Sequence, residues 1–416
     1  MPLPALPNLA ASGLSGVTIL RGKYGKFSPP KVRHAAIQRS KVAKFILHIG
    51  DAKCGSTAIQ NSLYRSRKTL AEKGIYFDTL FPNSGHVALT LLFGQRSRGA
   101  SKKREALAAQ TLALLQEEAR NYDWIILSAE NFINLSPETV AQIADTIAGP
   151  VERLEAMAYV RDPVAMYASS IQQILKGSHL FPLPESYHRR VDHKLNAWQA
   201  HLGRERFQVR LFERRSLDGG DVVTDFAAYL ASVTGTPITL SPASNNASLT
   251  AEQTCILQRF RMAVYPDQPG TLQPRSTVLA QFLASLNTIR SSGTPIALSD
   301  LARDVVSHRN ADVVDELVRS FPDLDLAAVS ERSAHPPQGP YPWTDNPSVE
   351  TILASINEGV VDCFASLLPE LNGGTAIGEQ GLDAAMSGLG FQTPQEIVAF
   401  REAWESYLKA SASCAR

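Results

Sequence analysis

Cysteine is scarce in this sequence: the 416 residues include four, at positions 54, 255, 363 and 414. They form no Cys-x-x-Cys pair, so neither a disulfide scaffold nor a zinc ribbon is indicated, and free thiols are typical of a reducing compartment. No apolar run approaches the roughly 18 residues of a membrane span, and the amino terminus lacks the pattern of a secretory signal. We therefore expect a cytoplasmic protein with no transmembrane segment.

The chain also lacks an excess of charge of either sign, because 41 Lys and Arg are balanced by 40 Asp and Glu. A net charge near zero provides no global field for nucleic acid, so any site for an anion must be local. No cluster of metal ligands is apparent, and we expect no metal. The length allows one large domain or two.

The segment 1–43 contains no acidic residue, and the first acid of the chain is Asp51. Lysine, arginine and proline are frequent in this segment, and proline opposes regular structure. We interpret it as a poorly ordered, basic leader. A targeting or membrane-surface segment is the alternative.

Short apolar runs of strand length alternate with helical segments up to about residue 233. This alternation predicts βαβ units, and hence an α/β fold of the P-loop type with three layers, α/β/α, around a central, mostly parallel sheet. The expected strands are 44–50, 75–78, 124–130, 154–160 and 207–214. The expected helices are 56–74, 101–120, 136–147, 162–176, 193–203 and 221–233.

Beyond about residue 250 the strand signal fades and helical segments follow one another. We expect an α/β core over residues 44–255 and a mainly helical extension over residues 256–416, either in the same domain or as a subdomain. Within the extension, "SAHPPQGPYPWTDNP" (333–347) is rich in proline and turn-forming residues, and we interpret it as a linker.

The stretch "HIGDAKCGST" joins the first expected strand to the first expected helix. Gly50 and Gly55 frame a loop whose backbone N–H groups, with the positive end of the following helix, suit a phosphate. Lys53 adds a charge inside the loop, and Ser56 and Thr57 add hydroxyl groups. An ATP-type P-loop is disfavoured, because that pattern needs lysine and then Ser or Thr directly after the second glycine. The alternative is a tight strand-to-helix turn with an exposed lysine.

A second stretch, "AYVRDPVAMYASS", contains the end of the fourth expected strand, so Arg161 should emerge at the same edge of the sheet as Lys53. Arg161 and the hydroxyl of Ser169 suit a second phosphate, since a guanidinium offers a rigid fork of donors. The alternative is a surface pair of Arg161 with Asp162 at a helix cap. Together, the two stretches indicate a ligand with two separate phosphate groups.

These two stretches resemble motifs of the sulfotransferases that use 3′-phosphoadenosine 5′-phosphosulfate (PAPS). "HIGDAKCGSTAIQ" resembles their 5′-phosphosulfate loop, and "YVRDPVAMYASS" resembles their 3′-phosphate motif. "LSAENF", "VRLFERRSLDGGDVVTDFAAYL" and "NNASLTAEQ" are similar to bacterial members related to glycan sulfotransferases. The resemblance covers roughly residues 44–255. Ala52 and Cys54 depart from the usual proline and threonine, and there is no Arg-Lys-Gly motif of the kind found in enzymes for small phenols and steroids.

The resemblance implies transfer of a sulfuryl group from PAPS to a hydroxyl or amine of a carbohydrate-type acceptor, without a metal. Lys53 would neutralise charge on the bridging oxygen as the bond breaks. Glu130, after the third strand, and His86, at a place where the family has a histidine, are the expected proton acceptors, with an ion-paired carboxylate and a surface histidine as the alternatives. The implied donor-binding residues are Lys53, Cys54, Gly55, Ser56, Thr57, Arg161 and Ser169.

Two other functions remain open at this point. One is a P-loop nucleotide kinase or hydrolase, and the other is a non-catalytic nucleotide- or glycan-binding protein with a sulfotransferase fold. The sequence defines neither the acceptor nor the oligomeric state.

Overall fold

The computed structural model describes residues 43–80, 84–93, 102–242, 248–326, 330, 337–343 and 347–414. The leader expected over 1–43 lies outside these residues except for Ala43. Part of the expected linker, 333–336 and 344–346, also lies outside them. All described residues belong to one compact unit, Ser40–Arg416.

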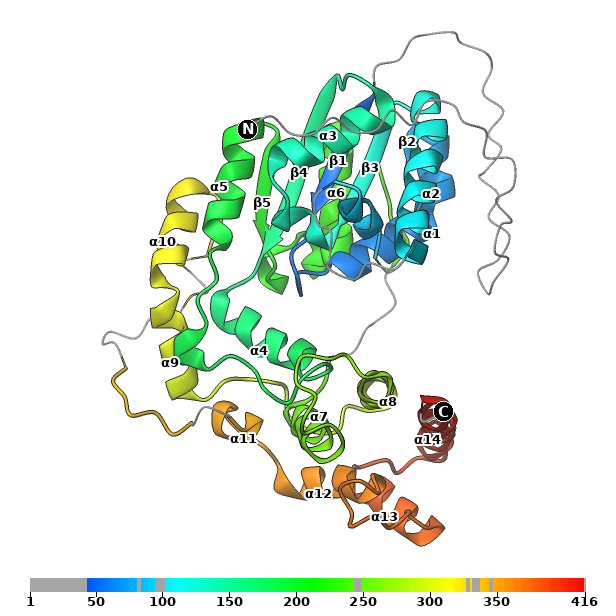
Figure 1. The fold of residues 1–416 in the computed structure, drawn as a ribbon, viewed down its shortest axis with the longest axis vertical. Helices are drawn as coiled ribbons and strands as arrows, with labels where there is room; N and C mark the ends of the chain where they lie inside the picture. Colours follow the sequence, from blue (N-terminus) through cyan, green and yellow to red (C-terminus); the bar gives the residue numbers. More distant parts are fainter. Residues whose placement is uncertain are drawn as a thin grey trace. The chain divides into compact units, whose positions relative to one another are not determined.

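Five strands form the central sheet in the order β2-β3-β1-β4-β5 (Figure 1). In the middle, β1 (Lys44–Ile49) lies between β3 (Trp124–Ala129) and β4 (Arg153–Val160). The outer strands are β2 (Ile75–Tyr76) and β5 (Phe207–Leu211). Every neighbouring pair is parallel, which confirms the predicted α/β fold with a parallel sheet. Both outer strands are shorter than predicted, because each has only one neighbour to extend its ladder.

Helices cover both faces of the sheet (Figure 1). On one face, α1 (Ser56–Glu72) and α6 (Val222–Thr234) pack together, and their apolar side chains join those of Ile46, Ile126 and Met157 in one buried cluster. On the other face lie α2 (Lys102–Glu118), α3 (Pro137–Ala148) and α5 (Val191–Leu202). With both faces covered, the central strands β1, β3 and β4 are buried along almost their whole length, whereas the edge strand β5 alternates apolar and polar residues.

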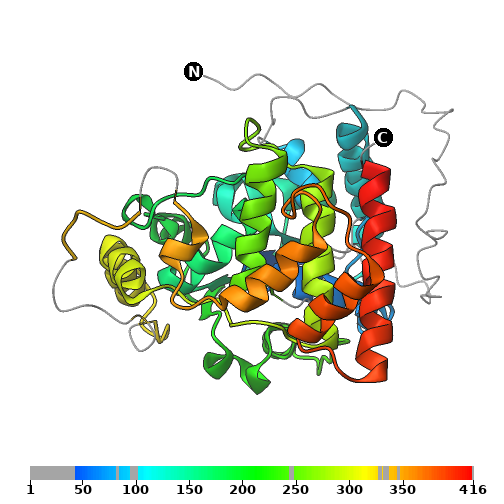
Figure 2. The same cartoon turned by 90° about the horizontal axis from the view of Figure 1, so that it is seen from below.

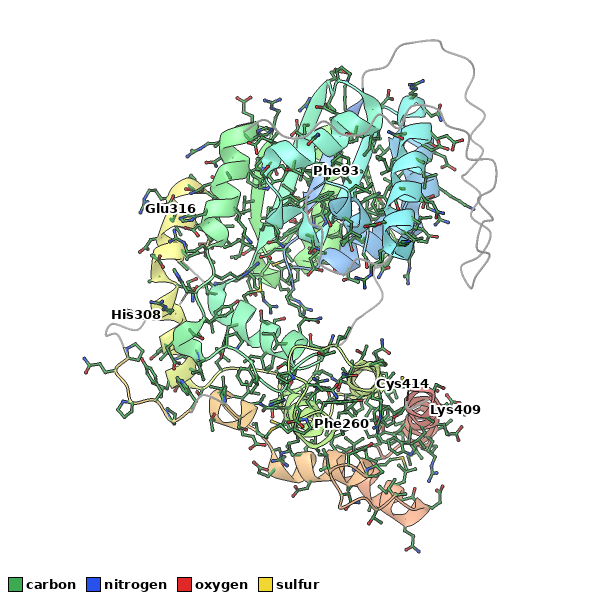
Figure 3. The ribbon with its side chains drawn as sticks, in the orientation of Figure 1. Phe93, Phe260, His308, Glu316, Lys409 and Cys414 are labelled. Carbon is green, nitrogen blue, oxygen red and sulfur yellow. The ribbon has the colours of Figure 1, made fainter. Side chains whose placement is uncertain are left out.

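The helix α4 (Pro163–Ile174) follows β4 and packs into a second buried cluster, which is built by the C-terminal helices. Phe260 lies in this cluster, remote from the sheet (Figure 3). Seen from below, α14, in red, runs beside α8 (Figure 2). The C-terminal helices are α7 (Ala251–Val264), α8 (Pro274–Ile289), α9 (Asp300–Arg309), α10 (Ala311–Ser320), α11 (Val349–Ile352), α12 (Glu358–Leu367), α13 (Glu379–Gly388) and α14 (Pro394–Cys414).

The helical extension begins with a strong start signal. Thr250 and Gln253 form a reciprocal capping box at the start of α7, and the helix runs across the expected division between residues 255 and 256. The division into an α/β core and a helical extension at this residue stays a prediction. Of the helices that the structure describes, none combines the length and the apolarity needed to cross a membrane.

Candidate functional site

The carboxyl ends of β1, β3 and β4 meet at one edge of the sheet. Ile49 pairs with Ala129 on one side and with Ala158 on the other, so the three chains leave the sheet side by side. The N–H of Gly50 continues this alignment by donating to the carbonyl of Ala129 at 3.1 Å. As predicted, the loop after β1, the segment after β3 and Arg161 after β4 all emerge at this edge.

Lys53 has an unusual backbone conformation. Its φ is 60°, and it is the only non-glycine residue with positive φ in the described part of the chain. For a residue with a Cβ this left-handed conformation costs about 1–2 kcal/mol. Such strain persists only where the surroundings hold it, and it concentrates at functional sites. The conformation of Lys53 is thus a first sign that this loop does more than connect a strand to a helix.

The glycines of the loop allow close packing within the protein. A Cβ on Gly50 would lie 2.7 Å from both the Glu130 Cα and the Ser56 Oγ. Gly55 has φ +78°, and a Cβ there would lie 2.8 Å from the ring of Phe212. Both glycines therefore allow the loop to pack tightly against its own scaffold, and their role of admitting a phosphate stays a prediction.

The amino end of α1 is left without an internal cap. The N-cap residue is Gly55, which has no side chain to accept a hydrogen bond, and the first turn contains no acidic residue. Among the described residues, no acceptor lies within hydrogen-bond geometry of the backbone N–H groups of Lys53, Ser56 and Thr57. The Ser56 hydroxyl instead donates back to the carbonyl of Asp51 at 3.2 Å, and the Cys54 N–H approaches the same carbonyl at 3.4 Å. Free N–H groups and the positive end of a helix suit an anion.

Arg161 lies against this loop, as the sequence predicts. Its Nη1 is 3.5 Å from the carbonyl oxygen of Lys53, and its guanidinium stands 5.7 Å from the ring centroid of Phe212. Asp162 does not neutralise the guanidinium by a direct ion pair in the described structure; its carboxylate caps α4 by accepting from the N–H of Ala165. Ser169 is partly exposed on α4. It lies about 9 Å along the helix from Pro163, the first residue of α4, because an α-helix rises 1.5 Å per residue.

The ammonium of Lys53 is surrounded more by positive than by negative charge. Partial burial is the main reason that its pKa is lowered to about 8, and the charges of Lys176 and Arg161 lower it further, while Glu130 acts in the opposite direction. Lys176, which follows α4, was missed by sequence reasoning because nothing in its spacing connects it to the loop. An anion in this place would relieve the repulsion among these cations.

Glu130 opens a short 3-10 helix (Glu130–Asn134) directly after β3, and its side chain is exposed. Desolvation by the surrounding protein and the charge of Asp51 raise its pKa, while Lys53 and Arg189 oppose the rise. Glu130 therefore lies within the electrostatic reach of Lys53, and its role as a proton acceptor stays a prediction. A carboxylate with a raised pKa is a better base than an ordinary one.

His86 is placed differently from the surface position considered as its alternative. It is fully buried, its Nε2 donates to the carbonyl of Asp78 at 2.9 Å, and its Nδ1 accepts from the N–H of Ser128 at 3.1 Å. Burial lowers its pKa to about 4. A neutral imidazole whose two nitrogens are both hydrogen-bonded to backbone groups is suited to holding a loop in place. These contacts do not support His86 as a proton acceptor, and that role stays a prediction.

Two further features complete the site. The Cys54 thiol is buried, and its pKa is raised by desolvation and by Asp51, so it behaves as a small apolar side chain. Asp51, which is 2 % exposed, forms an ion pair with Arg189, and its Oδ2 lies 2.7 Å from the Nη1 of that residue. The described residues contain no group of three or more His, Cys, Asp or Glu side chains placed to hold a metal ion.

Comparisons with known proteins find no matching family model and no matching curated relative. Among solved structures, a sulfotransferase from Alicyclobacillus acidocaldarius has a TM-score of 0.35 and 14% identity, and the match covers 69% of this chain and 98% of that one. The sulfotransferase domain of the Synechococcus PCC 7002 olefin synthase has a TM-score of 0.29 and 15% identity, covering 49% of this chain and 77% of that one. The signal recognition particle 54 kDa protein of Aeropyrum pernix in complex with GDP has a TM-score of 0.20 and 13% identity, covering 91% and 80%. None of these TM-scores reaches 0.5, and the function of this chain is inferred below from its own residues.

The packing role of Gly55 can be tested with Gly55→Ala. We expect a loss of about 2–5 kcal/mol in the free energy of unfolding, from the left-handed backbone and from overpacking against Phe212. Gly235→Ala is a matched control, because Gly235 is also left-handed, with φ +70°, but a Cβ added there would meet no atom within 4 Å. The control should lose only the backbone part, about 1–2 kcal/mol. Equal losses in urea unfolding would show that the contact with Phe212 does not matter.

The lowered pKa of Lys53 predicts a pH-dependent anion affinity. The ammonium is protonated below about pH 8 and attracts an anion, whereas above that pH binding must be accompanied by uptake of a proton. The affinity for adenosine 3′,5′-bisphosphate should therefore fall by up to about tenfold per pH unit above the pKa of Lys53. The phosphates of the ligand do not contribute to this pH dependence, because their second ionisation, with a pKa of about 6, is already complete at these pH values.

Calorimetry in two buffers of different ionisation enthalpy measures this proton uptake directly. Lys53→Gly should abolish the uptake, and glycine readily adopts the positive φ that Lys53 has. A wild-type affinity that stays constant between about pH 7 and about pH 10 would contradict the assignment of this pKa to the binding site.

Proposed function

We propose that this chain is a sulfotransferase that moves a sulfuryl group from PAPS to a hydroxyl or amine of a carbohydrate-type acceptor. The observation that carries the proposal is the arrangement of Lys53. It is held in a left-handed conformation beside the uncapped end of α1, with Arg161 against its carbonyl. The P-loop pattern for ATP places its lysine directly after the second glycine, and here Ser56 occupies that position.

The residues present fit a donor with two phosphate groups. The free N–H groups of Lys53, Ser56 and Thr57 would hold the 5′-phosphate, with Cys54 and Gly55 completing the loop. Arg161 and Ser169 would hold the 3′-phosphate on the adjoining α4. When bound, PAPS supplies the sulfuryl group together with its bisphosphate leaving group. No residue needs to bind a metal in this scheme, because the cations of the chain carry the neutralising charge.

The chemical work of the chain is then electrostatic. Lys53 neutralises charge that develops on the bridging oxygen of the donor, in a loop that is already fixed before the reaction. Glu130 accepts the proton of the acceptor hydroxyl or amine, helped by its raised pKa. A carbohydrate-type acceptor and a cytoplasmic location stay predictions, and each can be tested separately from the donor.

The donor site can be tested by calorimetry with adenosine 3′,5′-bisphosphate and with ATP in the presence of Mg²⁺. We expect the bisphosphate to bind more tightly, and Arg161→Ala combined with Ser169→Ala to weaken it by about 30-fold or more, because two bonds to a charged group are lost. Ser170→Ala is a matched control, since the next residue of α4 points about 100° away around the helix. Preference for Mg²⁺–ATP would favour a kinase or hydrolase and overturn the proposal.

Catalysis can be tested by turnover of labelled PAPS on a panel of glycans. Lys53→Gly should reduce the rate by about 10²- to 10³-fold, the usual effect of removing one group that stabilises a developing negative charge. Because glycine accommodates the loop conformation, the loss reports on the ammonium rather than on the backbone. Tight binding of the bisphosphate without turnover of any glycan, peptide or small amine would identify a non-catalytic binding protein instead.

A further inference from the structure

Asp51 is the centre of the contacts that fix the loop. Its carbonyl accepts from Ser56 and Cys54, and its Oδ1 accepts from the N–H of Ala52 at 2.8 Å. Its carboxylate also receives both Nη groups of Arg189, in the fork geometry that an arginine offers to a carboxylate. Asp51 is nearly inaccessible to solvent, so removing Arg189 would leave a buried charge without its counterion.

Arg189 comes from the strap, which we define as residues 177–190 between α4 and α5. The strap is held in place by Asn310, which is fully buried at the junction of α9 and α10. The Asn310 Oδ1 accepts from the N–H of Arg189 at 3.1 Å, and its Nδ2 donates to the carbonyl of Tyr187 at 2.8 Å. One amide side chain thus fixes the backbone on both sides of His188.

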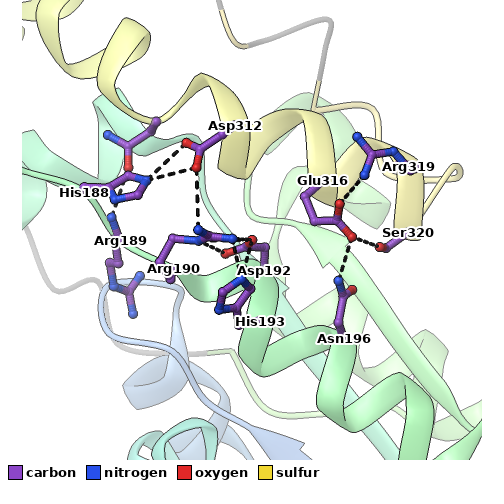
Figure 4. Close-up of polar contacts among 11 residues, drawn as sticks. His188, Arg189, Arg190, Asp192, His193, Asn196, Asp312, Glu316, Arg319 and Ser320 are labelled. Atoms are coloured by element: carbon purple, nitrogen blue, oxygen red, sulfur yellow. Dashed lines mark hydrogen bonds and ion pairs between the residues drawn. The ribbon is translucent and has the colours of Figure 1, made fainter.

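A hydrogen bond of His188 and an ion pair of Arg190 strengthen this attachment of the strap to α10 (Figure 4). The His188 Nε2 lies 3.1 Å from the Oδ1 of Asp312, and the Nη1 of Arg190 lies 3.6 Å from its Oδ2. In Figure 4 the guanidinium of Arg189 points away from this network, toward the blue segment that contains the loop. Neighbouring residues of the strap therefore face opposite ways: His188 and Arg190 toward α10, and Arg189 toward Asp51.

We propose that Arg189 is a positioning residue for Lys53, and that Asn310 orients Arg189, so that the α9–α10 junction forms part of the donor site. This inference rests on the proposed function. The physical reason is that the left-handed Lys53 follows Asp51 by two residues, so a loop released from Arg189 can relax to an ordinary conformation. Arg189 itself does not need to touch the donor, since its donors are directed at Asp51.

Calorimetry with two probes can test this role. We expect Arg189→Met to weaken adenosine 3′,5′-bisphosphate by about tenfold or more, because the partner of a buried charge pair is lost. The affinity for adenosine 3′-monophosphate, which lacks the 5′-phosphate, should stay within about twofold of wild type. Asn310→Ala should act in the same direction with a smaller effect, about threefold, since hydrogen bonds rather than a charge are removed.

The matched control is Arg319→Met. Arg319 also lies on this side of the molecule, in an exposed ion pair with Glu316 on α10, but it has no contact with the strap in the described structure. It should leave both affinities unchanged. Hydrogen exchange of the free protein gives a second readout, and the amides of residues 51–57 should exchange faster in Arg189→Met than in Arg319→Met.

A variant that fails to fold is replaced by the double variant Asp51→Asn with Arg189→Met, which removes both charges and so avoids an unpaired buried carboxylate. An equal loss of affinity for both probes, or no loss together with unchanged exchange at residues 51–57, would overturn the positioning role. Failure of the wild-type protein to bind the bisphosphate would overturn the proposed function as well, so the two failures are distinguishable.

Discussion

The parallel pairing of β1 with β3 and β4 is the constraint on which the rest of the site depends. Because the three strands run in the same direction and in register, their carboxyl ends lie at one edge. Everything that follows them along the chain, from Asp51 to Glu130 and Arg161, must begin there. Groups that are more than 100 residues apart in sequence, such as Lys53 and Arg161, thus become neighbours, which is the usual reason that such folds bind ligands at this edge.

The charged side chains at this edge of the sheet fall into two groups. Asp51 and Arg189 neutralise each other, and therefore serve the structure of the loop. Among the described residues, Lys53, Lys176 and Arg161 form no such ion pair, and burial together with the repulsion from Lys176 and Arg161 lowers the pKa of Lys53. A protein that only needed a strand-to-helix turn would have no reason to keep cations so close together. The arrangement becomes favourable once an anion is present, and this supports the proposed anion site over a purely structural turn.

Much of this arrangement could be predicted from local sequence. Apolar runs of strand length identified the strands, and the position of Arg161 directly after one of them predicted its meeting with Lys53. The pair of Asp51 with Arg189 could not be predicted, because 138 residues separate them and no periodicity connects the strap to the loop. The environment of His86 was also hidden, since its partners are the backbone groups of Asp78 and Ser128, and backbone partners leave no mark on the sequence. The break between α11 and α12 was hidden as well: α11 ends at Ile352, and the side chain of Asn357 caps the start of α12.

The helical extension has a role that its composition does not suggest. Its cluster of buried apolar residues includes side chains of α4, so the helix that carries Ser169 is packed against the extension rather than only against the sheet. The strap leaves from the same region and brings Arg189 back to the loop. Both parts of the proposed donor site thus depend on the extension. The 3′-phosphate part depends on it through the packing of α4, and the Lys53 loop depends on it through Asn310, Arg189 and Asp51. It follows that an isolated α/β core ending near residue 255 would keep the pair of Asp51 with Arg189 but lose the packing of α4 and the hydrogen bonds of Asn310 that orient the strap.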